Sequence, residues 1–283
     1  MSLNVVVRAA GQGKRMHSNL PKVLHLLAGR PLLAYVLDAA RALSPAKIVV
    51  VTGHEAALVQ AAFAAPDVVF VNQNPQLGTG HAIQQAAGEL LPGGKTLVLL
   101  GDVPLIQAAT LKLLVESAVN RVSMLTALPQ DTQGYGRVVR DARKKVRRVV
   151  EQKDATNAQL KIREINTGIF CYPTARLATW LGRLKNNNAQ GEYYITDVLP
   201  MAIQARVPVE VVLCDDAVQV EGVNTRTQLA RLERLHQQRL ATRLLEQGVA
   251  IADPARMDVR GDLSCGRDVA IDIGCIFEGR VKL

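Results

Sequence analysis

The sequence predicts an α/β protein built on a doubly wound, mostly parallel sheet, and three observations support this. Short β-branched apolar runs alternate with longer segments whose apolar residues recur at helical spacing. The alternation has the length of β-α-β units, which join parallel strands. Glycine-rich or polar turns follow the predicted strands, at the sheet edge where such proteins bind ligands.

In the first hundred residues the pattern predicts strands at 3–7, 47–51, 68–71 and 96–100, and helices at 30–43, 52–64 and 80–91. Further strands are predicted at 122–127, 136–140, 145–152, 165–172 and 207–214, with a helix at 193–204. The strongly basic run 141–148 is expected to be a solvated hairpin. A long amphipathic helix is predicted at 224–247, where Gly248 stops it.

The last 25 residues show an apolar period of six, which is typical of a β-helix. Two columns of apolar residues repeat at this spacing: Val259, Cys265, Ile271 and Phe277, then Leu263, Val269, Cys275 and Val281. Only about four hexads fit, whereas solenoids need several stacked repeats. We therefore expect that the chain stops just inside a second domain.

Composition bounds the possible functions. The 283 residues have 48% apolar content and a formal charge of +9, which favours anionic ligands, although a solvated basic face gives the same balance. Nucleic-acid binding is disfavoured, because zinc spacings and RNA-binding aromatic motifs are missing and aromatics are 4%. The four cysteines show no CxxC spacing, and no apolar run reaches the roughly 20 residues of a membrane helix. A cytoplasmic protein without a membrane span is expected.

A glycine-rich turn, residues 9–13, follows the first predicted strand, and the cations Arg15 and Lys22 come soon after it. Free backbone N–H groups ringed by cations favour a phosphate site, but two glycines alone also fit an ordinary tight turn. The turn lacks the third glycine of the dinucleotide fingerprint, because position 16 is Met16, and it lacks the Gly-Lys-Ser/Thr ending of the P-loop.

Other polar groups follow later strands. Gln73 and the small-residue turn 76–82 are suited to a base or another planar polar group. Asp102 ends a strand, where it is either a ligand or a helix cap, and Asn224 is an N-cap, a metal ligand or both. One carboxylate and one carboxamide match Mg²⁺, which takes few protein ligands and completes its shell with phosphate and water.

Several motifs occur in a characteristic order: 9–16, 20–24, 76–81, 101–105, 134–137, 151–154, 165–168, 186–197 and 220–224. Together they resemble the N-terminal domain of the bacterial bifunctional N-acetylglucosamine-1-phosphate uridyltransferase/glucosamine-1-phosphate acetyltransferases. The resemblance implies a Rossmann-like nucleotidyltransferase domain at 1–223, a linker helix at 224–248 and the start of a left-handed β-helix at 249–283. The acetyltransferase part would then be absent.

The implied activity is Mg²⁺-dependent transfer of uridylyl from UTP to N-acetylglucosamine 1-phosphate, which yields UDP-N-acetylglucosamine, a cell-wall precursor, and pyrophosphate. The resemblance assigns Asp102 and Asn224 to the metal, and Arg15 and Lys22 to catalysis. It assigns the nucleotide to Ala9, Ala10, Gly11, Gly13, Lys22, Gln73, Gly78 and Thr79, and the sugar phosphate to Gly136, Glu151, Asn166 and Thr196. Full-length relatives are trimers, whereas this chain is expected to be mainly monomeric.

Three positions depart from the family pattern: Arg8 replaces the usual Leu, Leu100 a frequent Tyr, and Lys144 an expected Gly. Two alternative functions stay open. One is a related sugar-1-phosphate nucleotidyltransferase with another base or sugar. The other is a nucleotide-binding protein without turnover, in which Arg8 blocks the productive placement of UTP.

Overall fold

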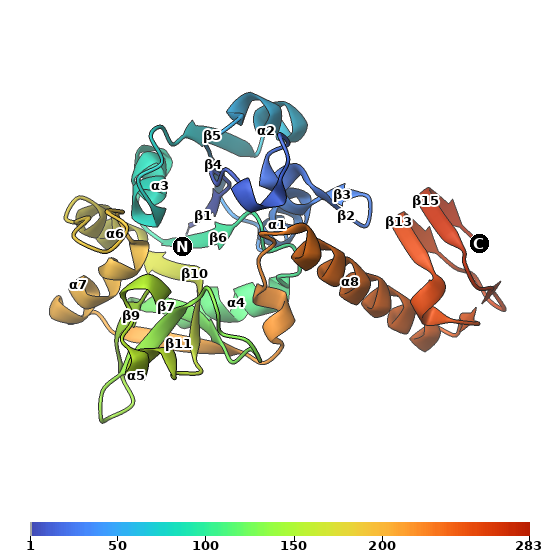
Figure 1. Cartoon of the computed structure of the whole chain (residues 1–283). Coiled ribbons are helices and arrows are strands. Elements are labelled where there is room, and N and C mark those ends of the chain that lie inside the picture. Colours follow the sequence, from blue (N-terminus) through green and yellow to red (C-terminus); the bar gives the residue numbers. More distant parts are fainter. Residues whose placement is uncertain (1) are drawn as a thin grey trace.

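A computed structural model describes residues 2–283, and its main body is a nine-stranded sheet with helices on both faces (Figure 1). The strands are β1 (Leu3–Arg8), β4 (Lys47–Thr52), β5 (Val68–Asn72), β6 (Lys95–Leu100), β7 (Val122–Ala127), β8 (Gly136–Arg140), β9 (Val146–Val150), β10 (Ile165–Pro173) and β11 (Val209–Cys214). Their order is β11-β7-β10-β6-β1-β4-β5, and the β8–β9 hairpin pairs with β10. Along this path of seven strands only β10 runs antiparallel to its neighbours, β6 and β7, so the predicted mostly parallel α/β sheet is confirmed. The β8–β9 hairpin adds antiparallel pairs at its edge.

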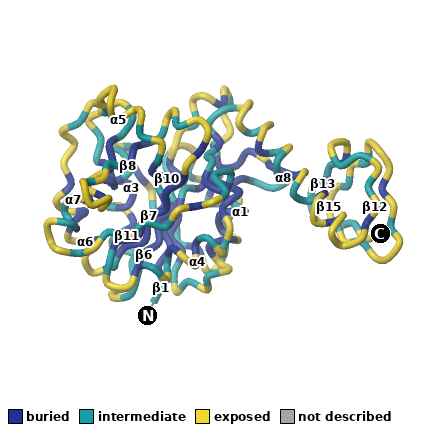
Figure 2. The backbone as a smooth tube through the Cα atoms, turned by 90° about the horizontal axis from the view of Figure 1, so that it is seen from below, coloured by how far each residue is buried: buried dark blue, intermediate teal, exposed yellow. Residues whose placement is uncertain are grey.

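Successive residues of β1 face opposite layers, which explains its continuous apolar run. Val5 and Val7 pack in one core with residues of α1 (Leu32–Arg41) and α4 (Ala108–Ser117). Val6 packs in the other core, with residues of α3 (Thr79–Ala86), α6 (Thr174–Leu181) and α7 (Val198–Gln204). Buried residues therefore follow the sheet, as Figure 2 shows.

Two kinds of difference from the predicted elements occur. The predicted strands are all present, with ends within two residues, and α2 (Ala56–Phe63) falls in its predicted range, but α4, α6 and the short α5 (Asn157–Leu160) were not predicted. The helix predicted at 193–204 begins too early. The N–H of Tyr193 donates to Leu77 O at 2.8 Å and its carbonyl accepts from Gly80 N at 2.6 Å, so this backbone is not available to a helix, and α7 starts at Val198.

The helix α8 (Arg226–Glu246) starts with a capping box. Thr225 Oγ1 accepts from Gln228 N at 3.1 Å, and Gln228 Oε1 accepts from Thr225 N at 3.1 Å. The N-cap is therefore Thr225, which corrects the N-cap reading of Asn224 and leaves the Asn224 side chain available for other contacts. Leu232 of α8 is buried beside the small hairpin β2 (Leu26–Leu27) and β3 (Arg30–Pro31).

Beyond α8 the chain coils into parallel strand pairs, well apart from the sheet (Figure 1). The strands are β12 (Ala250–Ile251), β13 (Asp258–Ser264), β14 (Ala270–Ile271) and β15 (Ile276–Lys282). Val259 pairs with Phe277, three hexads later, and Val259 and Ile271 are buried between the strands, as the period of six predicted. Gln237 joins α8 to this stack, because its carboxamide exchanges two hydrogen bonds of 2.8 Å with the backbone of Val259.

Across residues 2–283, every helix is too short or too polar to cross a membrane.

Candidate active site

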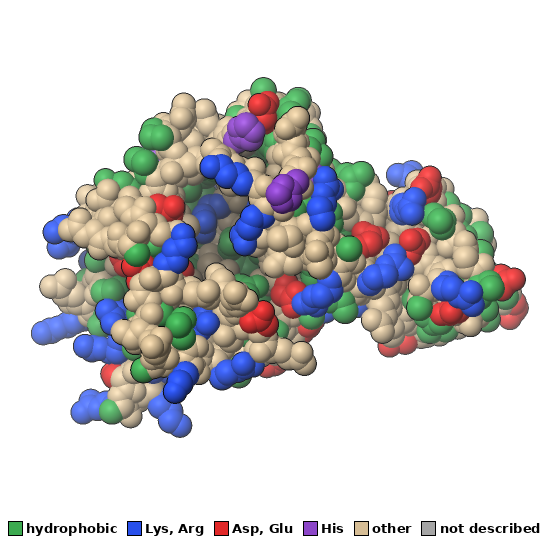
Figure 3. All heavy atoms as spheres, in the orientation of Figure 1, with side chains coloured by type: hydrophobic (Ala, Val, Ile, Leu, Met, Phe, Trp, Pro, Cys, Tyr) green, Lys and Arg blue, Asp and Glu red, His purple; other side chains and the backbone are tan. Residues whose placement is uncertain are grey.

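A pocket of about 270 Å³ opens at the carboxyl ends of β1 and β6. Two backbone hydrogen bonds fix the start of the glycine-rich turn there, from Ala9 N to Val51 O at 2.8 Å and from Gly101 N to Arg8 O at 2.9 Å. Eight predicted site residues line the pocket: Ala9, Ala10, Gly11, Lys22, Gln73, Gly78, Thr79 and Asp102. In the same orientation as Figure 1, this face is hollowed between the part with α3 and the part with β9, and Lys and Arg side chains border the hollow (Figure 3).

Lys22 connects the two residues that the resemblance assigns to a metal. Its ammonium donates to Asp102 Oδ2 and, at 3.1 Å, to Asn224 Oδ1. The backbone supports this arrangement, because Val223 N donates to Asp102 O at 2.9 Å. A carboxylate oxygen and a carboxamide oxygen on one cation are hard donors of the kind Mg²⁺ takes, so this donor set fits the ion. Within residues 2–283 no cluster of three His, Cys, Asp or Glu exists, which leaves no richer metal site.

The glycine-rich turn is shaped by its contact with Lys22. Gly13 has φ of 63°, and a Cβ there would lie 2.8 Å from Lys22 Cβ, so a side chain would displace the lysine. Arg15 lies on the following 3-10 turn, where buried Met16 anchors the segment. Its own side chain is exposed and is not among the residues that line the pocket.

The turn before α3 is clamped from two sides. Gln73 Nε2 donates to Gly78 O at 2.9 Å, and Gln76 Nε2 donates to Ala10 O, which ties this turn to the glycine-rich turn. Gly78 has φ of 108°, and a Cβ there would lie 2.7 Å from Glu192 Cβ. These contacts hold Gln73 and Thr79 at the pocket wall, where a flat polar ring would fit between them and Ala9.

The four residues assigned to the sugar phosphate lie together beside the pocket. Asn166 pairs with Gly136 across β10 and β8, and Glu151 lies against Gly136, where an added Cβ would be 3.2 Å from Glu151 Oε2. Thr196 Oγ1 donates to Glu151 Oε1 at 3.4 Å. Burial raises the pKa of Glu151 above that of an ordinary glutamate, and the bond from Thr196 and the charge of Arg8 offset this only in part.

Six lining residues were not among the predicted site residues: Arg8, Val23, Gln76, Ala82, Leu100 and Glu192. Gln76 and Glu192 lie inside the family motifs 76–81 and 186–197, so the sequence could have identified them as site residues. Leu100 reaches toward the sugar side, because its Cδ1 lies 3.2 Å from where a Cβ on Gly168 would be. Arg8 brings a cation into the pocket, at one of the three positions that depart from the family pattern.

The pocket belongs to a region with a known domain match. Residues 5–185 match the MobA-like NTP transferase domain, which covers more than half of the chain.

The chain belongs to the MobA-like NTP transferase family.

Relatives of this NTP transferase extend the match over nearly the whole chain. The Bifunctional protein GlmU of Burkholderia lata is 59% identical over 282 residues, and that of Cupriavidus pinatubonensis is 58% identical over 284. Each match covers 99% of this chain and 62% of the relative, so the chain spans less than two thirds of their length.

Solved structures share the NTP transferase fold at low identity. A nucleotidyl transferase from Methanothermobacter has a TM-score of 0.59 at 21% identity, covering 82% of this chain and 96% of its own. The inositol-1-phosphate CTP transferase from T. maritima has a TM-score of 0.62 at 14% identity, covering 82% and 96%. These likenesses concern the fold.

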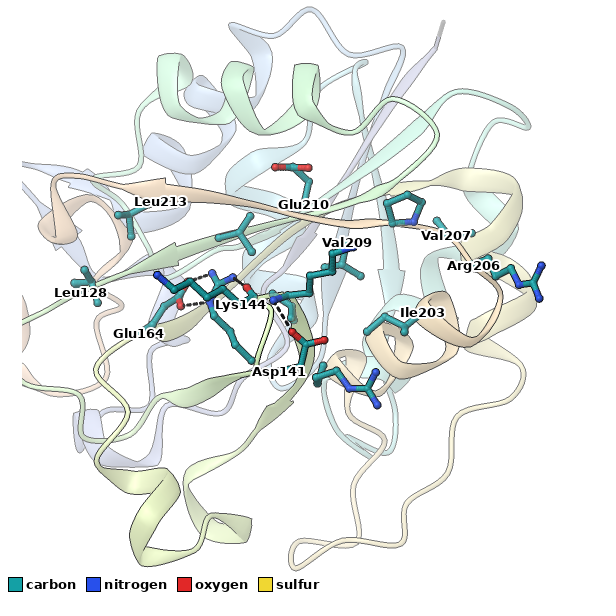
Figure 4. Close-up of a pocket in the computed structure, with 16 residues that line it drawn as sticks. Leu128, Asp141, Lys144, Glu164, Ile203, Arg206, Val207, Val209, Glu210 and Leu213 are labelled. Carbon is teal, nitrogen blue, oxygen red and sulfur yellow. Dashed lines mark hydrogen bonds and ion pairs between the residues drawn. The ribbon is translucent and has the colours of Figure 1, made fainter.

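A second, larger hollow of about 880 Å³ lies between the β8–β9 hairpin and β11 (Figure 4). None of the predicted site residues lines it. In this hollow the Arg140 guanidinium donates to both carboxylate oxygens of Glu164, at 2.7 Å each. Leu128 and Leu213 are exposed on the rim of the hollow. The smaller pocket is therefore the candidate active site of this NTP transferase, because the strand ends and motif residues converge there.

Proposed function

We propose that this chain transfers uridylyl from UTP to N-acetylglucosamine 1-phosphate, with release of pyrophosphate and with Mg²⁺ as the cofactor. The observation that carries the proposal is the meeting of three groups at one sheet edge. The Lys22–Asp102–Asn224 cluster, the Gln73–Gly78 turn and the Glu151–Thr196 pair come from distant parts of the chain. The ordered motifs and the 58–59% identity to proteins named Bifunctional protein GlmU support the same assignment.

In the proposed mechanism a phosphate oxygen of the sugar phosphate attacks the α-phosphorus of UTP in line, and the P–O bond to pyrophosphate breaks. No covalent enzyme intermediate is needed, so the chain contributes positioning and charge neutralisation. When bound at Asp102 and Asn224, Mg²⁺ supplies a positive charge on the phosphate oxygens. Lys22 and the free N–H groups of the glycine-rich turn bind the phosphates, and Arg15 would have to approach from the rim.

The base and the sugar are positioned by opposite walls of the pocket. Gln73, Gly78 and Thr79 would hold uracil against Ala9 and Ala10, where a second ring would crowd the clamped turn. On the other side, Gly136, Glu151 and Asn166 would hold the amino sugar, and Thr196 would lie near its phosphate. One oxygen of the Glu151 carboxylate accepts from Thr196, so the other oxygen would be available to accept from a hydroxyl or amide of the sugar.

We also propose that residues 1–223 form the nucleotidyltransferase domain, 224–248 the linker helix and 249–283 the start of a left-handed β-helix. The sheet and its helices supply the pocket, whereas α8 bridges to the stack through contacts such as Gln237 to Val259. The β2–β3 hairpin also touches the stack, since a Cβ added at Gly29 would lie 3.2 Å from Arg260. The parallel pairing of strands three hexads apart supports the β-helix assignment.

The test is pyrophosphate release from UTP and N-acetylglucosamine 1-phosphate with Mg²⁺. We expect release by the unmodified chain and a loss of at least about 100-fold in Asp102→Ala, because one ligand of the cation is removed. Asp272→Ala, an exposed aspartate in the stack beyond α8, is the matched control and should keep full activity. Release with another nucleotide or sugar phosphate in place of this pair would instead favour a related nucleotidyltransferase.

A further inference from the structure

Arg8 is the last residue of β1, and the sheet fixes its position on both sides. It pairs with Leu100 of β6 and Val51 of β4 in parallel register, and its carbonyl accepts from Gly101 N at 2.9 Å. From this strand end the side chain lines the candidate active site. The sheet therefore fixes the backbone from which the Arg8 side chain extends.

No hydrogen bond or ion pair within residues 2–283 involves the Arg8 side chain, whereas two arginines of β8 are held by other protein groups. The Arg140 guanidinium is held by Glu164, and Arg137 donates to Thr132 Oγ1 at 3.0 Å and to a backbone carbonyl. Burial lowers the pKa of Arg8, which is the expected direction for a cation taken from water. Arg8 is thus a partly buried cation that lines the pocket without a direct partner among residues 2–283.

Of the three carboxylates near Arg8, none lies within ion-pair distance of it among residues 2–283, and two are bonded to other groups. Asp102, Glu151 and Glu192 each attract its charge. Asp102 already binds the ammonium of Lys22, and Glu151 accepts from Thr196. A partly desolvated guanidinium without a partner is costly, and the group that satisfies it best is a planar or tetrahedral oxyanion that takes two N–H bonds.

We infer that Arg8 is a phosphate-binding residue of this active site, which holds a phosphate oxygen of a substrate directly. The inference rests on the proposed function, because it takes the pocket to be the site of nucleotidyl transfer. Two substrates carry the required group: the nucleotide at its α-phosphate and the sugar at its 1-phosphate. Arg8 would add a fixed cation to Lys22, at a position where related enzymes have an apolar side chain.

The test is equilibrium binding to Arg8→Leu and Arg8→Lys, measured by calorimetry with UTP and, separately, with N-acetylglucosamine 1-phosphate. Uridine, followed by ligand-observed NMR, is the probe without phosphate. We expect Arg8→Leu to weaken the binding of one phosphate ligand about tenfold or more, and to leave uridine unchanged. Arg8→Lys should recover part of the loss, because an ammonium keeps the charge but not the two-pronged geometry.

Arg147→Leu is the matched control, since it removes one positive charge at an exposed position of β9. Arg147 lines the other hollow and not the candidate active site. Its affinities should equal those of the unmodified chain, which separates a direct contact from the general field of the +9 surface. The ligand that loses affinity in Arg8→Leu identifies the source of the phosphate. If Arg8→Leu does not fold, Arg8→Gln carries the same comparison.

Three results would overturn the inference. The first is an unchanged affinity of Arg8→Leu for both phosphate ligands. The second is tighter UTP binding by Arg8→Leu, which would mean that Arg8 obstructs the pocket. The third is an equal loss of affinity for uridine and for UTP. If the proposed function is wrong, the unmodified chain binds another nucleotide and another sugar phosphate instead. The same variants are then titrated with that pair of ligands. A chain that binds no phosphate ester overturns both.

Discussion

Lys22 and Asp102 form an ion pair at the carboxyl edge of the sheet, although 80 residues separate them in the chain. Their side chains are only 12% and 15% exposed, so the pair is weakly screened by solvent. The same ammonium donates to Asn224 at 3.1 Å. Lys22 therefore already holds both oxygens that we propose as metal ligands, and the lysine and a divalent cation compete for them.

The first prediction concerns this competition. Lys22→Met should bind Mn²⁺ about fivefold more tightly in the absence of nucleotide, because removing a nearby cation is worth about 1 kcal/mol. Pyrophosphate release should fall in the same variant, because the phosphates lose a cation. Electron paramagnetic resonance of free Mn²⁺ measures the affinity. Lys14→Met, an exposed cation on the same segment, should leave Mn²⁺ affinity unchanged, and an equal change in both variants would contradict the competition.

The second prediction concerns pH and Glu151, whose pKa is raised chiefly by burial, with further contributions from Asp154 and Asp197. The bound sugar needs the ionised carboxylate as an acceptor. Affinity for N-acetylglucosamine 1-phosphate should therefore fall on acidification at a higher pH than an ordinary glutamate would give. Calorimetry across the acidic range measures this fall, and Glu151→Gln should remove it while the titration of the ligand's own phosphate remains.

The ionisation of Glu151 affects folding stability in the opposite direction from sugar binding. Because the folded-state pKa of Glu151 lies above its unfolded value, its stabilising contribution is present below the unfolded pKa and is lost as pH rises through the folded pKa. Glu151→Gln should then be relatively more stable near neutral pH. A stability difference that does not change with pH would show that Glu151 ionises normally.

The third prediction concerns Gly78, whose φ of 108° disfavours any side chain. An added Cβ would lie 2.7 Å from Glu192 Cβ and 2.8 Å from Tyr193 O. Gly78→Ala should cost roughly 1–3 kcal/mol of folding free energy and weaken UTP binding, because the turn must shift away from the pocket. Gly88→Ala is the control, since nothing lies within 4 Å of its added Cβ. Thermal unfolding and UTP titration of both variants test this prediction, and equal losses in the two variants would contradict it.

Local patterns predicted the sheet well and the assembly of the site only in part. Each strand carries its own signal, since it is a short apolar run, and so does the Gly13 turn. Three helices were missed: α5 has only four residues and is too short to show a helical period, and α4 buries just Leu111 and Leu114 of its ten residues. The third, α6, carries a helical pattern that the prediction did not use. The contact of Lys22 with Asn224, 202 residues away, has no local signature, and the resemblance, which assigned Asn224 and Asp102 to a metal, did not predict it.

The fourth prediction concerns Lys144, which stands where the resemblance leads us to expect glycine. The structure gives a physical reason, because Lys144 has φ of 61° in the turn between β8 and β9. Lys144→Gly should relieve this strain and stabilise the chain by about 0.5–1 kcal/mol, or about 1–3 °C in Tm. Lys145→Gly, whose φ is negative, should destabilise it instead. A lower Tm for Lys144→Gly would show that the lost entropy of glycine outweighs the strain.

The helix α8 carries the coiled strands away from the pocket, although the β2–β3 hairpin also reaches them, because a Cβ added at Gly29 would lie 3.2 Å from Arg260. Its 21 residues span about 32 Å, which is several times the Debye length of about 8 Å at physiological salt. The coiled strands, however, pack beside the first half of the helix, where Arg234 pairs with Asp258 and Gln237 bonds to Val259. Arg234 lies eight residues, or about 12 Å, from the start of α8, which is more than one Debye length, so salt weakens the effect of these charges on the phosphates without removing it.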